Sequence, residues 1–375
     1  MQSADLPQSF GQWVLRCTVD DGQLEPYHFQ HLRLSMPTLQ DGQALVRVRL
    51  INIHSATRLR IARRSIAIGE TDPNNYALGE VVLSRDPAFA VGAVVACQAG
   101  WQEYQVISSR DLPVGFSEPS AVVKALNRTN SPWTYAFRSS IASMWPPHTL
   151  MEVLGTSGMT AWFGMREYGP LMPRDAVAVA ATTGSVGSIV AQLAKAAGCR
   201  VVGFAGGPER CEWVLDTLRI DRCLDYKSTS LVTDIRAAFP EGIDVFSDGV
   251  GGSLTELVTR CMNRHGRIFS YGSAAAAYAS RLDAPSSKKP SMRVAFGLTE
   301  AVDTLLQKRN IKSGAWTVDK FYHERLTAED DLSRLMLMGM LHPNGNVIRG
   351  FEHLPKAIVD LYRFPRAGKL QVAFE

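Results

Sequence analysis

The strongest constraint on the fold is one continuous segment that reads as a strand, a glycine turn, a helix and a second strand. Val177 and Val179 lie in a short apolar run typical of a buried parallel strand, and Gly184 and Gly187 follow it. Apolar residues then recur at helical spacing as far as Gly198, a residue type that commonly ends helices, before the next apolar run begins. This order predicts a βαβ unit of a doubly wound, parallel α/β sheet.

The glycine turn of this unit is predicted to hold the pyrophosphate of a dinucleotide. Glycines let the backbone approach phosphates, and free N–H groups at a helix start attract negative charge. The chain has Ala181 close to the place of the first glycine of the complete G-x-G-x-x-G pattern, so a purely structural crossover is the alternative interpretation. We expect the cofactor to contact the turn and the first helical residues, namely Thr183, Gly184, Ser185, Val186 and Gly187.

The residues after the second strand favour NADPH over NADH. An NAD-binding unit needs an acidic residue there, but this chain has Gly206 and Gly207, followed by Arg210. A guanidinium beside open glycines suits a ribose 2′-phosphate, which it binds with paired hydrogen bonds. Glu209 is the competing feature, because its carboxylate could take the NAD role or pair with Arg210. Tyr226 ends the next strand, where it could flank the phosphate or only shield the sheet.

Helices and strands continue to alternate beyond this unit, whereas both ends of the chain read as β-rich. Strands are predicted at residues 222–226, 243–246 and 266–272, and helices at 211–218, 231–239 and 254–263. The N-terminal part predicts an alternating, half-buried strand at 43–53 and further strands at 79–84, 92–98 and 103–107. A strand near 316–318, a helix at 329–340 and a last strand at 369–375 follow. We expect one β-rich domain, made from both chain ends, that carries the nucleotide-binding unit as an insert.

Length and composition are those of a soluble globular protein with two domains. The chain has 375 residues, of which 46% are hydrophobic and 20% charged, and its net charge is +4. It contains no run of Lys and Arg, so we expect no nucleic-acid partner. No stretch approaches the roughly 18 apolar residues of a membrane span, and the N-terminus lacks a signal-peptide pattern. We therefore expect no membrane association and a cytoplasmic location.

Neither the cysteines nor the histidines form a metal-binding pattern. The cysteines include no CxxC pair, which predicts reduced, mostly buried thiols. The eight histidines include no HExxH motif, and a satisfied or surface role is the stronger interpretation of His54. We therefore expect no metal ion. The six cysteines are Cys17, Cys97, Cys199, Cys211, Cys223 and Cys261.

Three further segments carry a resemblance to a known family. Together with the glycine turn, residues 154–164 (LGTSGMTAWFG), 248–252 (DGVGG) and 350–357 (GFEHLPKA) resemble the medium-chain dehydrogenase/reductase superfamily. Within it the chain is similar to the zinc-independent branch of leukotriene B4 12-hydroxydehydrogenase, prostaglandin reductase and NADPH-dependent alkenal double-bond reductases. The resemblance implies a GroES-like catalytic domain at residues 1–148 and 313–375, a Rossmann NADPH-binding domain at 149–312, an active site between them, and a homodimer.

The resemblance also implies positions for the cofactor. It puts the nicotinamide near Gly158, Met159 and Thr160, and the 2′-phosphate on Arg210, which replaces a family lysine. The other cofactor contacts that it implies are Tyr226, Asp248, Gly249, Tyr271, Trp316 and Lys369.

The departures from the family pattern cluster on the substrate side. Gly249 and Arg366 stand where the family has Asn, and residues 54–58 (HSATR) replace its Asp-Pro-Tyr-Met-Arg segment. A family tyrosine near the substrate has only an out-of-step counterpart here, Tyr278, inside an alanine run. The sequence therefore defines the cofactor better than the substrate.

The chemistry that the resemblance implies is reduction of the C=C bond of an α,β-unsaturated carbonyl compound. Hydride from NADPH adds to the β-carbon, and hydrogen-bond donors hold the charge that develops on oxygen, so no zinc is needed. A ribose hydroxyl, a water or a tyrosine then protonates the α-carbon. Tyr278 and Tyr271 are the candidate proton donors, with simple packing as the alternative for each, and His54 is a weaker candidate.

Three other functions remain open from the sequence. The first is an NADPH quinone reductase on the same scaffold. The second is a carbonyl reductase or alcohol dehydrogenase, which is disfavoured because Gly79-Glu80 lacks the histidine of the GHE zinc signature. The third is a cofactor-binding protein without turnover, an interpretation that the substitutions at Gly249 and Arg366 keep open.

Overall fold

The chain folds into two compact units. The computed structural model describes residues 6–19, 23–62, 64–109, 134–272, 300–315, 318–363 and 367–374. Unit 1 contains Met1–Gly155, Asp319–Arg325 and Gly345–Glu375, and unit 2 contains Thr156–Val318 and Leu326–Asn344. These limits differ from the expected domain limits at both ends, because residues 149–155 belong to unit 1 and residues 326–344 belong to unit 2. The roles of the units as catalytic and NADPH-binding domains remain a proposal.

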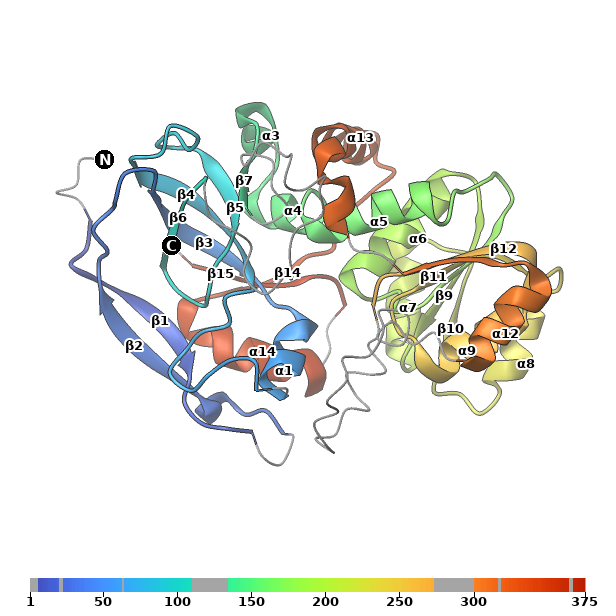
Figure 1. The fold of residues 1–375 in the computed structure, drawn as a ribbon. Helices are drawn as coiled ribbons and strands as arrows, with labels where there is room; N and C mark the ends of the chain where they lie inside the picture. Colours follow the sequence, from blue (N-terminus) through green and yellow to red (C-terminus); the bar gives the residue numbers. More distant parts are fainter. Residues whose placement is uncertain are drawn as a thin grey trace. The chain divides into compact units, whose positions relative to one another are not determined.

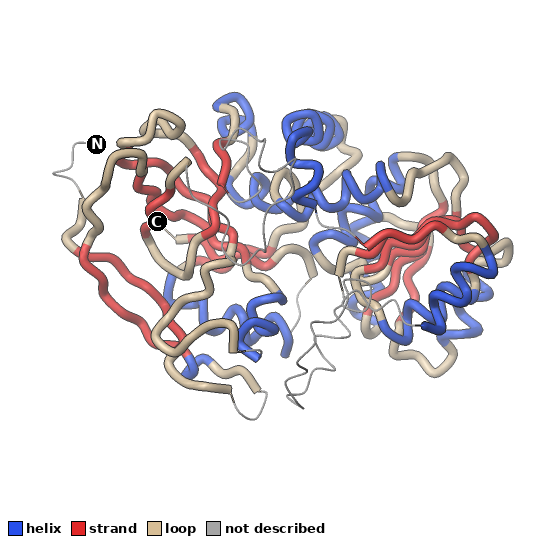
Figure 2. The backbone as a smooth tube through the Cα atoms, in the orientation of Figure 1, coloured by secondary structure: helices blue, strands red, loops and turns tan. Residues whose placement is uncertain are grey.

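Unit 2 is built around a six-stranded parallel sheet, which confirms the predicted doubly wound α/β fold (Figure 1). Helices lie on both sides of the strands (Figure 2), so the sheet is buried on both faces. The strands are β8 (Ala176–Val179), β9 (Arg200–Ala205), β10 (Arg222–Asp225), β11 (Ile243–Asp248), β12 (Met262–Ser270) and β13 (Lys312–Ala315). The helices are α5 (Thr156–Glu167), α6 (Ser185–Ala196), α7 (Pro208–Leu218), α8 (Leu231–Ala238), α9 (Gly252–Arg260), α12 (Glu300–Arg309) and α13 (Arg325–Leu337).

The strand order places a switch point in the middle of this sheet. The order is β10-β9-β8-β11-β12-β13, so the chain runs outward in one direction from β8 to β10 and in the other from β11 to β13. Open α/β sheets bind ligands beyond the carboxyl ends of the strands at such a reversal. The glycine turn follows β8 directly, and the Asp248-Gly249 turn follows β11, so both lie at the switch point.

Two predicted elements of unit 2 are wrong in their limits. The predicted helix 254–263 ends earlier, at Arg260, because Met262 already pairs with Ile243 as the first residue of β12. The strand expected near 316–318 lies earlier, at Lys312–Ala315, and pairs in parallel with β12, so it belongs to the unit 2 sheet. Val318 begins a 3-10 turn instead.

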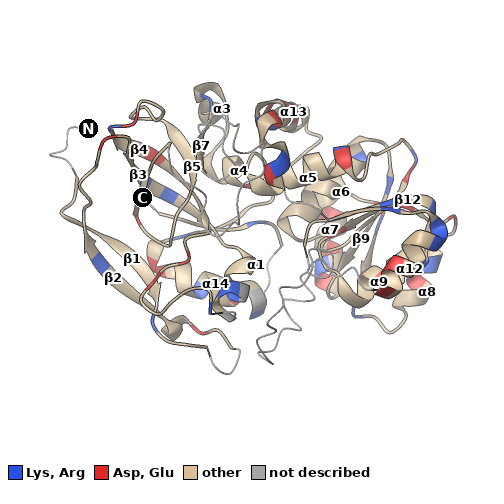
Figure 3. Cartoon of the chain, in the orientation of Figure 1, with Lys and Arg blue, Asp and Glu red and all other residues tan. Residues whose placement is uncertain are grey.

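Charged residues of both signs alternate over the helices of unit 2 (Figure 3). Helix α12 carries Glu300 and Asp303 in its first turn and Lys308 and Arg309 in its last. This distribution opposes the helix dipole at both ends and stabilises the helix. The charges on this element are therefore explained by local helix stability.

Unit 1 is β-rich, as expected. Its main sheet follows the order β14-β15-β3-β4-β5-β7, with β6 also paired to β3, and β1 and β2 form a separate hairpin. All pairs are antiparallel except β14 with β15. The strands are β1 (Ser9–Leu15), β2 (Phe29–Ser35), β3 (Ala44–Asn52), β4 (Tyr76–Ser84), β5 (Val94–Gln98), β6 (Tyr104–Ile107), β7 (Thr134–Ala136), β14 (Asn346–Arg349) and β15 (Leu370–Ala373). The helices are α1 (Ser55–Ala62), α3 (Ser139–Met144), α4 (Pro147–Glu152) and α14 (Leu354–Arg363).

Strand β3 is more buried than its alternating sequence predicts. Val46 and Val48 belong to the large core of unit 1, whereas Leu45 packs in a second core with Phe10 and Tyr104. The first part of the strand therefore has an apolar core on each face, and only Arg47 and Arg49 are half-buried.

None of the helices in the described part of the chain is long and apolar enough to cross a membrane.

Candidate active site

The glycine turn has the geometry of a phosphate-binding helix start. Gly184 is the N-cap of α6 and no side chain caps the helix, so the first N–H groups of α6 have no side-chain acceptor. A Cβ at Gly187 would lie 2.3 Å from the carbonyl oxygen of Ala181, so no larger residue fits there without a shift. Ala181 itself has a φ of 50°, the left-handed conformation that favours glycine. The chain thus keeps the turn of the complete motif although its first glycine is replaced.

Thr182 holds this turn to the neighbouring strand, and the sequence analysis missed it. Its hydroxyl donates to the carbonyl of Val179 at 2.6 Å and accepts from the N–H of Phe204 at 2.8 Å. The side chain is fully buried, and a Cβ at Gly203 would lie 2.6 Å from its oxygen. Thr182 therefore joins the end of β8 to β9, a role that only the spatial pairing of the two strands reveals.

The end of β9 forms an open loop beside a tyrosine and an arginine. The Tyr226 hydroxyl lies 2.5 Å from where a Cβ at Gly206 would be, and the side chain keeps 43% of its surface exposed. Gly207 has a φ of 96° and begins α7, whose first turn carries the half-buried Arg210. Arg210 makes no ion pair within the part of the chain that the structure describes. The structure thus brings the predicted 2′-phosphate residues to one loop.

Asp225 shapes this loop and was not predicted. Its Oδ1 accepts hydrogen bonds from the N–H groups of Gly207 and Lys227, each at 2.9 Å. The Gly207 bond, followed by the Lys227 bond, lowers the pKa of the Asp225 carboxyl. Asp225 therefore fixes the backbone of the loop before α7, the helix that carries Arg210 in its first turn.

The residues expected near the nicotinamide lie on α5. Gly158 and Met159 are buried, and the Met159 side chain has no exposed surface, whereas Thr160 is half-buried. Of these three residues, Thr160 has the side chain best exposed to a ligand.

Asp248, Gly249 and Tyr271 meet at the switch point. The buried Asp248 carboxylate accepts from the N–H groups of Val250 and Gly251 at 2.9 Å and from the Thr255 hydroxyl at 2.5 Å. Burial raises the pKa of Asp248 despite these bonds. A Cβ at Gly249 would lie 2.6 Å from the Tyr271 ring. Asp248 therefore stabilises its own turn, and Gly249 leaves room for Tyr271.

Tyr271 keeps its proton at this position. Its hydroxyl reaches the carbonyl of Ala180 at 3.5 Å, and burial raises the pKa of the phenol well above its ordinary value. A hydroxyl in this state acts as a hydrogen-bond donor more readily than as an acid.

His54 lies in unit 1 beside Tyr76, with the two ring centroids 5.9 Å apart. Burial lowers the pKa of His54 well below its ordinary value, and the charges of Lys369 and Arg60 lower it further. Lys369 is 5% exposed, and its ammonium group donates to the carbonyl of Ile53 at 3.4 Å. The structure thus brings His54 and Lys369, which the sequence analysis treated separately, close to a tyrosine that it did not single out.

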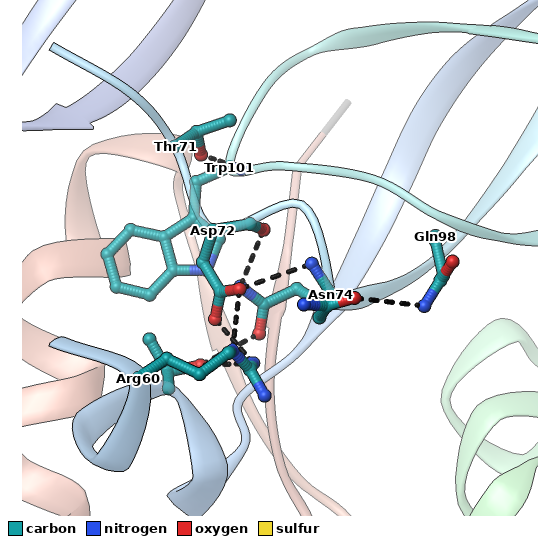
Figure 4. Close-up of polar contacts among 8 residues, drawn as sticks. Arg60, Thr71, Asp72, Asn74, Gln98 and Trp101 are labelled. Atoms are coloured by element: carbon teal, nitrogen blue, oxygen red, sulfur yellow. Dashed lines mark hydrogen bonds and ion pairs between the residues drawn. The ribbon is translucent and has the colours of Figure 1, made fainter. Parts of the chain in front are cut away.

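A polar network next to these residues holds α1 to the loop that precedes β4 (Figure 4). The Arg60 guanidinium donates two hydrogen bonds to the Asp72 carboxylate, at 2.8 and 2.5 Å. Thr57 donates to Asn75 at 3.2 Å, and Asn74 joins the same loop to Gln98 at 3.3 Å. The Trp101 N–H donates to the Thr71 hydroxyl at 2.8 Å. These contacts fix the chain on both sides of the loop.

Three residues singled out from the sequence, Tyr278, Trp316 and Arg366, lie outside the described residues.

Comparison with known proteins finds relatives that match residues of both units. A family model described as zinc-binding dehydrogenase matches residues 185–308, and one described as the N-terminal domain of oxidoreductase matches residues 12–114. NADPH-dependent curcumin reductase of Escherichia coli (strain K12) is 26% identical over 365 residues, which are 96% of this chain and 96% of the relative. Prostaglandin reductase 1 of Bos taurus is 27% identical over 91% of this chain and 92% of its own. The crystal structure of CurA in complex with NADPH from Vibrio vulnificus has a TM-score of 0.76 at 25% identity, covering 97% of this chain and 99% of that chain. The chain belongs to the medium-chain dehydrogenase/reductase superfamily.

Within this superfamily the chain lies in the zinc-independent reductase branch. Among the residues that can be described, no group of three or more His, Cys, Asp or Glu side chains is arranged to hold a metal ion. The absence of a metal remains a prediction.

One departure from the superfamily pattern has a structural reason. Gly249 replaces the Asn of the family turn, and the Tyr271 ring occupies the space that any side chain at 249 would need. The residues at positions 249 and 271 therefore depend on each other, and this chain has a tyrosine at the switch point of its parallel sheet.

Proposed function

We propose that the protein is an NADPH-dependent reductase of activated C=C bonds, which adds hydride to the β-carbon of α,β-unsaturated carbonyl compounds without zinc. The observation that carries this proposal is the uncapped start of α6 next to the Arg210 loop, in a chain whose relatives include an NADPH-dependent curcumin reductase and prostaglandin reductases. When bound, NADPH supplies the hydride.

The residues of unit 2 suit the phosphates of this cofactor. The backbone from Gly184 to Gly187 would hold the pyrophosphate, because no side chain caps the first N–H groups of α6 and the glycines leave the surface open. Arg210 and Tyr226 would hold the 2′-phosphate, since the guanidinium makes no ion pair with any described residue and the tyrosine is exposed beside Gly206. The contacts of Gly158, Met159, Thr160, Trp316 and Lys369 with the cofactor are proposals from the resemblance alone.

The protein must also hold the charge that develops on the substrate oxygen. Neutral donors that keep their protons can do so without transferring them, but the Tyr271 hydroxyl is directed to the carbonyl of Ala180 instead. The proton for the α-carbon then comes from another source, such as water.

The proposal is tested by cofactor titration and a substrate panel. Fluorescence and calorimetry with NADPH and NADH measure cofactor choice, and NADPH oxidation is followed with enals, enones and quinones. We expect tight NADPH binding and turnover of enals and enones. Turnover of quinones alone would indicate a quinone reductase, and binding without any turnover would indicate a cofactor-binding protein. No response to NADPH at millimolar concentration would refute the proposal.

We further propose a homodimer and a cytoplasmic location. Strand β13 ends the unit 2 sheet, and its outer edge pairs with no other strand of the described chain, so it offers a surface for a second copy. All six cysteines are free, which suits a reducing compartment. Light scattering on a sizing column gives the mass in solution.

A further inference from the structure

One buried nitrogen in unit 1 lacks a hydrogen-bond partner. The Nε2 atom of His54 is enclosed and makes no hydrogen bond to any residue that the structure describes, although the ring as a whole is half-buried. Most buried polar atoms in proteins are paired with protein, water or ligand, because an unpaired one destabilises the fold. This nitrogen is therefore suited to an oxygen atom that is not part of the chain.

Tyr76 presents a second unpaired group next to it. Its ring centroid lies 5.9 Å from that of His54, and its hydroxyl makes no hydrogen bond within the described chain. Burial raises the pKa of Tyr76 well above its ordinary value, and it lowers the pKa of His54. Both groups are therefore neutral near pH 7, so the phenol donates and the imidazole can donate from Nε2.

The ammonium group of Lys369 places a positive charge close to His54. Lys369 is almost fully buried, and its ammonium group donates to the carbonyl of Ile53, the residue before His54. Burial lowers its pKa to about 8, so most of the side chain is charged at pH 7. A buried ammonium group stabilises negative charge that develops nearby.

The polar network of Figure 4 fixes the two rings relative to each other. His54 directly precedes α1, and Tyr76 directly follows Asn75 at the start of β4. The Arg60–Asp72 ion pair and the Thr57–Asn75 hydrogen bond connect exactly these two segments. The Asp72 side chain is 3% exposed, so this ion pair is shielded from water. The spacing of the rings therefore depends on buried contacts and not on a mobile surface loop.

We infer that His54 and Tyr76 together bind one oxygen atom of the substrate, the carbonyl oxygen on which negative charge develops, and that Arg60 and Asp72 are positioning residues for the pair. The inference rests on the proposed reductase function. Hydride addition forms a C–H bond at the β-carbon, the C=C π pair forms the new bond between the α-carbon and the carbonyl carbon, and the carbonyl π pair moves to oxygen. The two donors stabilise the negatively charged oxygen by hydrogen bonds, and water supplies the proton to the α-carbon.

The first test replaces the two donors. Tyr76→Phe and His54→Phe each remove a donor, and removal of one such donor typically lowers kcat by about 100- to 1000-fold. We expect a loss of at least tenfold in kcat with enones for each variant and an unchanged Kd for NADPH. Tyr104→Phe is the matched control, because Tyr104 is a buried tyrosine of unit 1 in a different core, and it should retain wild-type kcat. Unchanged kcat in Tyr76→Phe, with enones turned over by the wild type, would overturn the inference and leave the proposed function standing.

A binding measurement makes this test independent of turnover. The probe is 4-nitrophenol, whose phenolate oxygen resembles an enolate and absorbs visible light. We expect the wild type to bind the phenolate in preference to the phenol, and both donor variants to weaken that binding at least tenfold. This result in a protein that reduces no enone would support the oxygen site and refute the proposed function. Equal phenolate binding by the wild type and both variants would overturn the inference.

The second test addresses the positioning residues. Asp72→Asn should lower kcat, but in combination with Tyr76→Phe it should lower kcat no further than Tyr76→Phe alone, because both changes remove the same interaction. Asp86→Asn is the control, since Asp86 is another buried carboxylate of unit 1 and accepts from the N–H groups of Ala88 and Ser109. Its effect should simply add to that of Tyr76→Phe. Additive losses for Asp72→Asn as well would mean that its role is only structural.

Discussion

At the scale of single residues, Arg210 is the side chain that most directly separates NADPH from NADH. It lies on the first turn of α7, beside the open Gly206-Gly207 loop, and makes no ion pair with the residues described by the structure. Arg210→Ala should weaken NADPH binding by about 1.5–3 kcal/mol, the range for charge-assisted hydrogen bonds, and leave NADH binding nearly unchanged. Calorimetric titration of both cofactors measures the difference.

The control for this prediction is Arg222→Ala. Arg222 is an exposed arginine at the amino end of β10, whereas the Arg210 loop follows the carboxyl end of the neighbouring β9, so its loss changes the net charge equally without touching the loop. Equal losses of affinity for NADPH and NADH in Arg210→Ala would show that the arginine does not read the 2′-phosphate.

At the scale of elements, the start of α6 depends on one close approach. Gly187→Ala places a methyl group 2.3 Å from the Ala181 carbonyl, and overpacking of this kind costs about 1–3 kcal/mol of stability. Gly184→Ala is the matched control, because its Cβ lies 3.1 Å from the same oxygen. We expect Gly187→Ala to lower both stability and NADPH affinity, and Gly184→Ala to be milder in urea unfolding. The reverse order would contradict the geometry of this turn.

The attachment of β8 to β9 depends on the Thr182 hydroxyl. Thr182→Val leaves the buried N–H of Phe204 without an acceptor, which should cost about 1–3 kcal/mol of unfolding free energy. Thr182→Ser keeps the hydroxyl and should retain most of the stability. Urea unfolding of both variants measures the difference, and equal stability of the two would show that the methyl group matters more than the hydrogen bond.

At the scale of the whole molecule, Lys369 makes stability depend on pH. Its pKa falls from 10.5 to about 8 on folding, so the unfolded chain binds more protons between these values. The destabilising effect of Lys369 is therefore fully present below pH 8, and it disappears as the pH rises to 10.5. Several buried thiols have raised pKa values and act in the opposite direction, for example Cys97 and Cys199.

A variant isolates the lysine from these thiols. Lys369→Met should be more stable than the wild type at pH 7, and the gain should shrink by up to about 1.4 kcal/mol per pH unit between pH 8 and 10.5. Unfolding free energies of both proteins across this range provide the measurement. A difference that stays constant with pH would show that Lys369 does not titrate differently on folding.

Local sequence patterns determined the parallel sheet and its nucleotide turn. The apolar runs of β8 and β9, the helical spacing of α6 and Gly198 at its end are all short-range signals, so one chain segment contains them completely. The arginine that follows two glycines was equally readable, whereas only the structure showed that Glu209 does not pair with it. The limits of helices and strands were harder to predict from the sequence. Met262, for example, joins β12 through its pairing with Ile243, which lies in a different strand.

Only the tertiary structure decided which polar side chains meet. Thr182 hydrogen-bonds across two strands, Tyr271 fills the space over Gly249, and Tyr76 faces His54 because a buried ion pair connects their segments. No periodicity in the sequence marks such contacts, since each one joins residues that folding brings together from separate elements. The sequence by itself thus determined the scaffold and the cofactor preference, while the long-range contacts of the fold decided the arrangement of donors for the substrate.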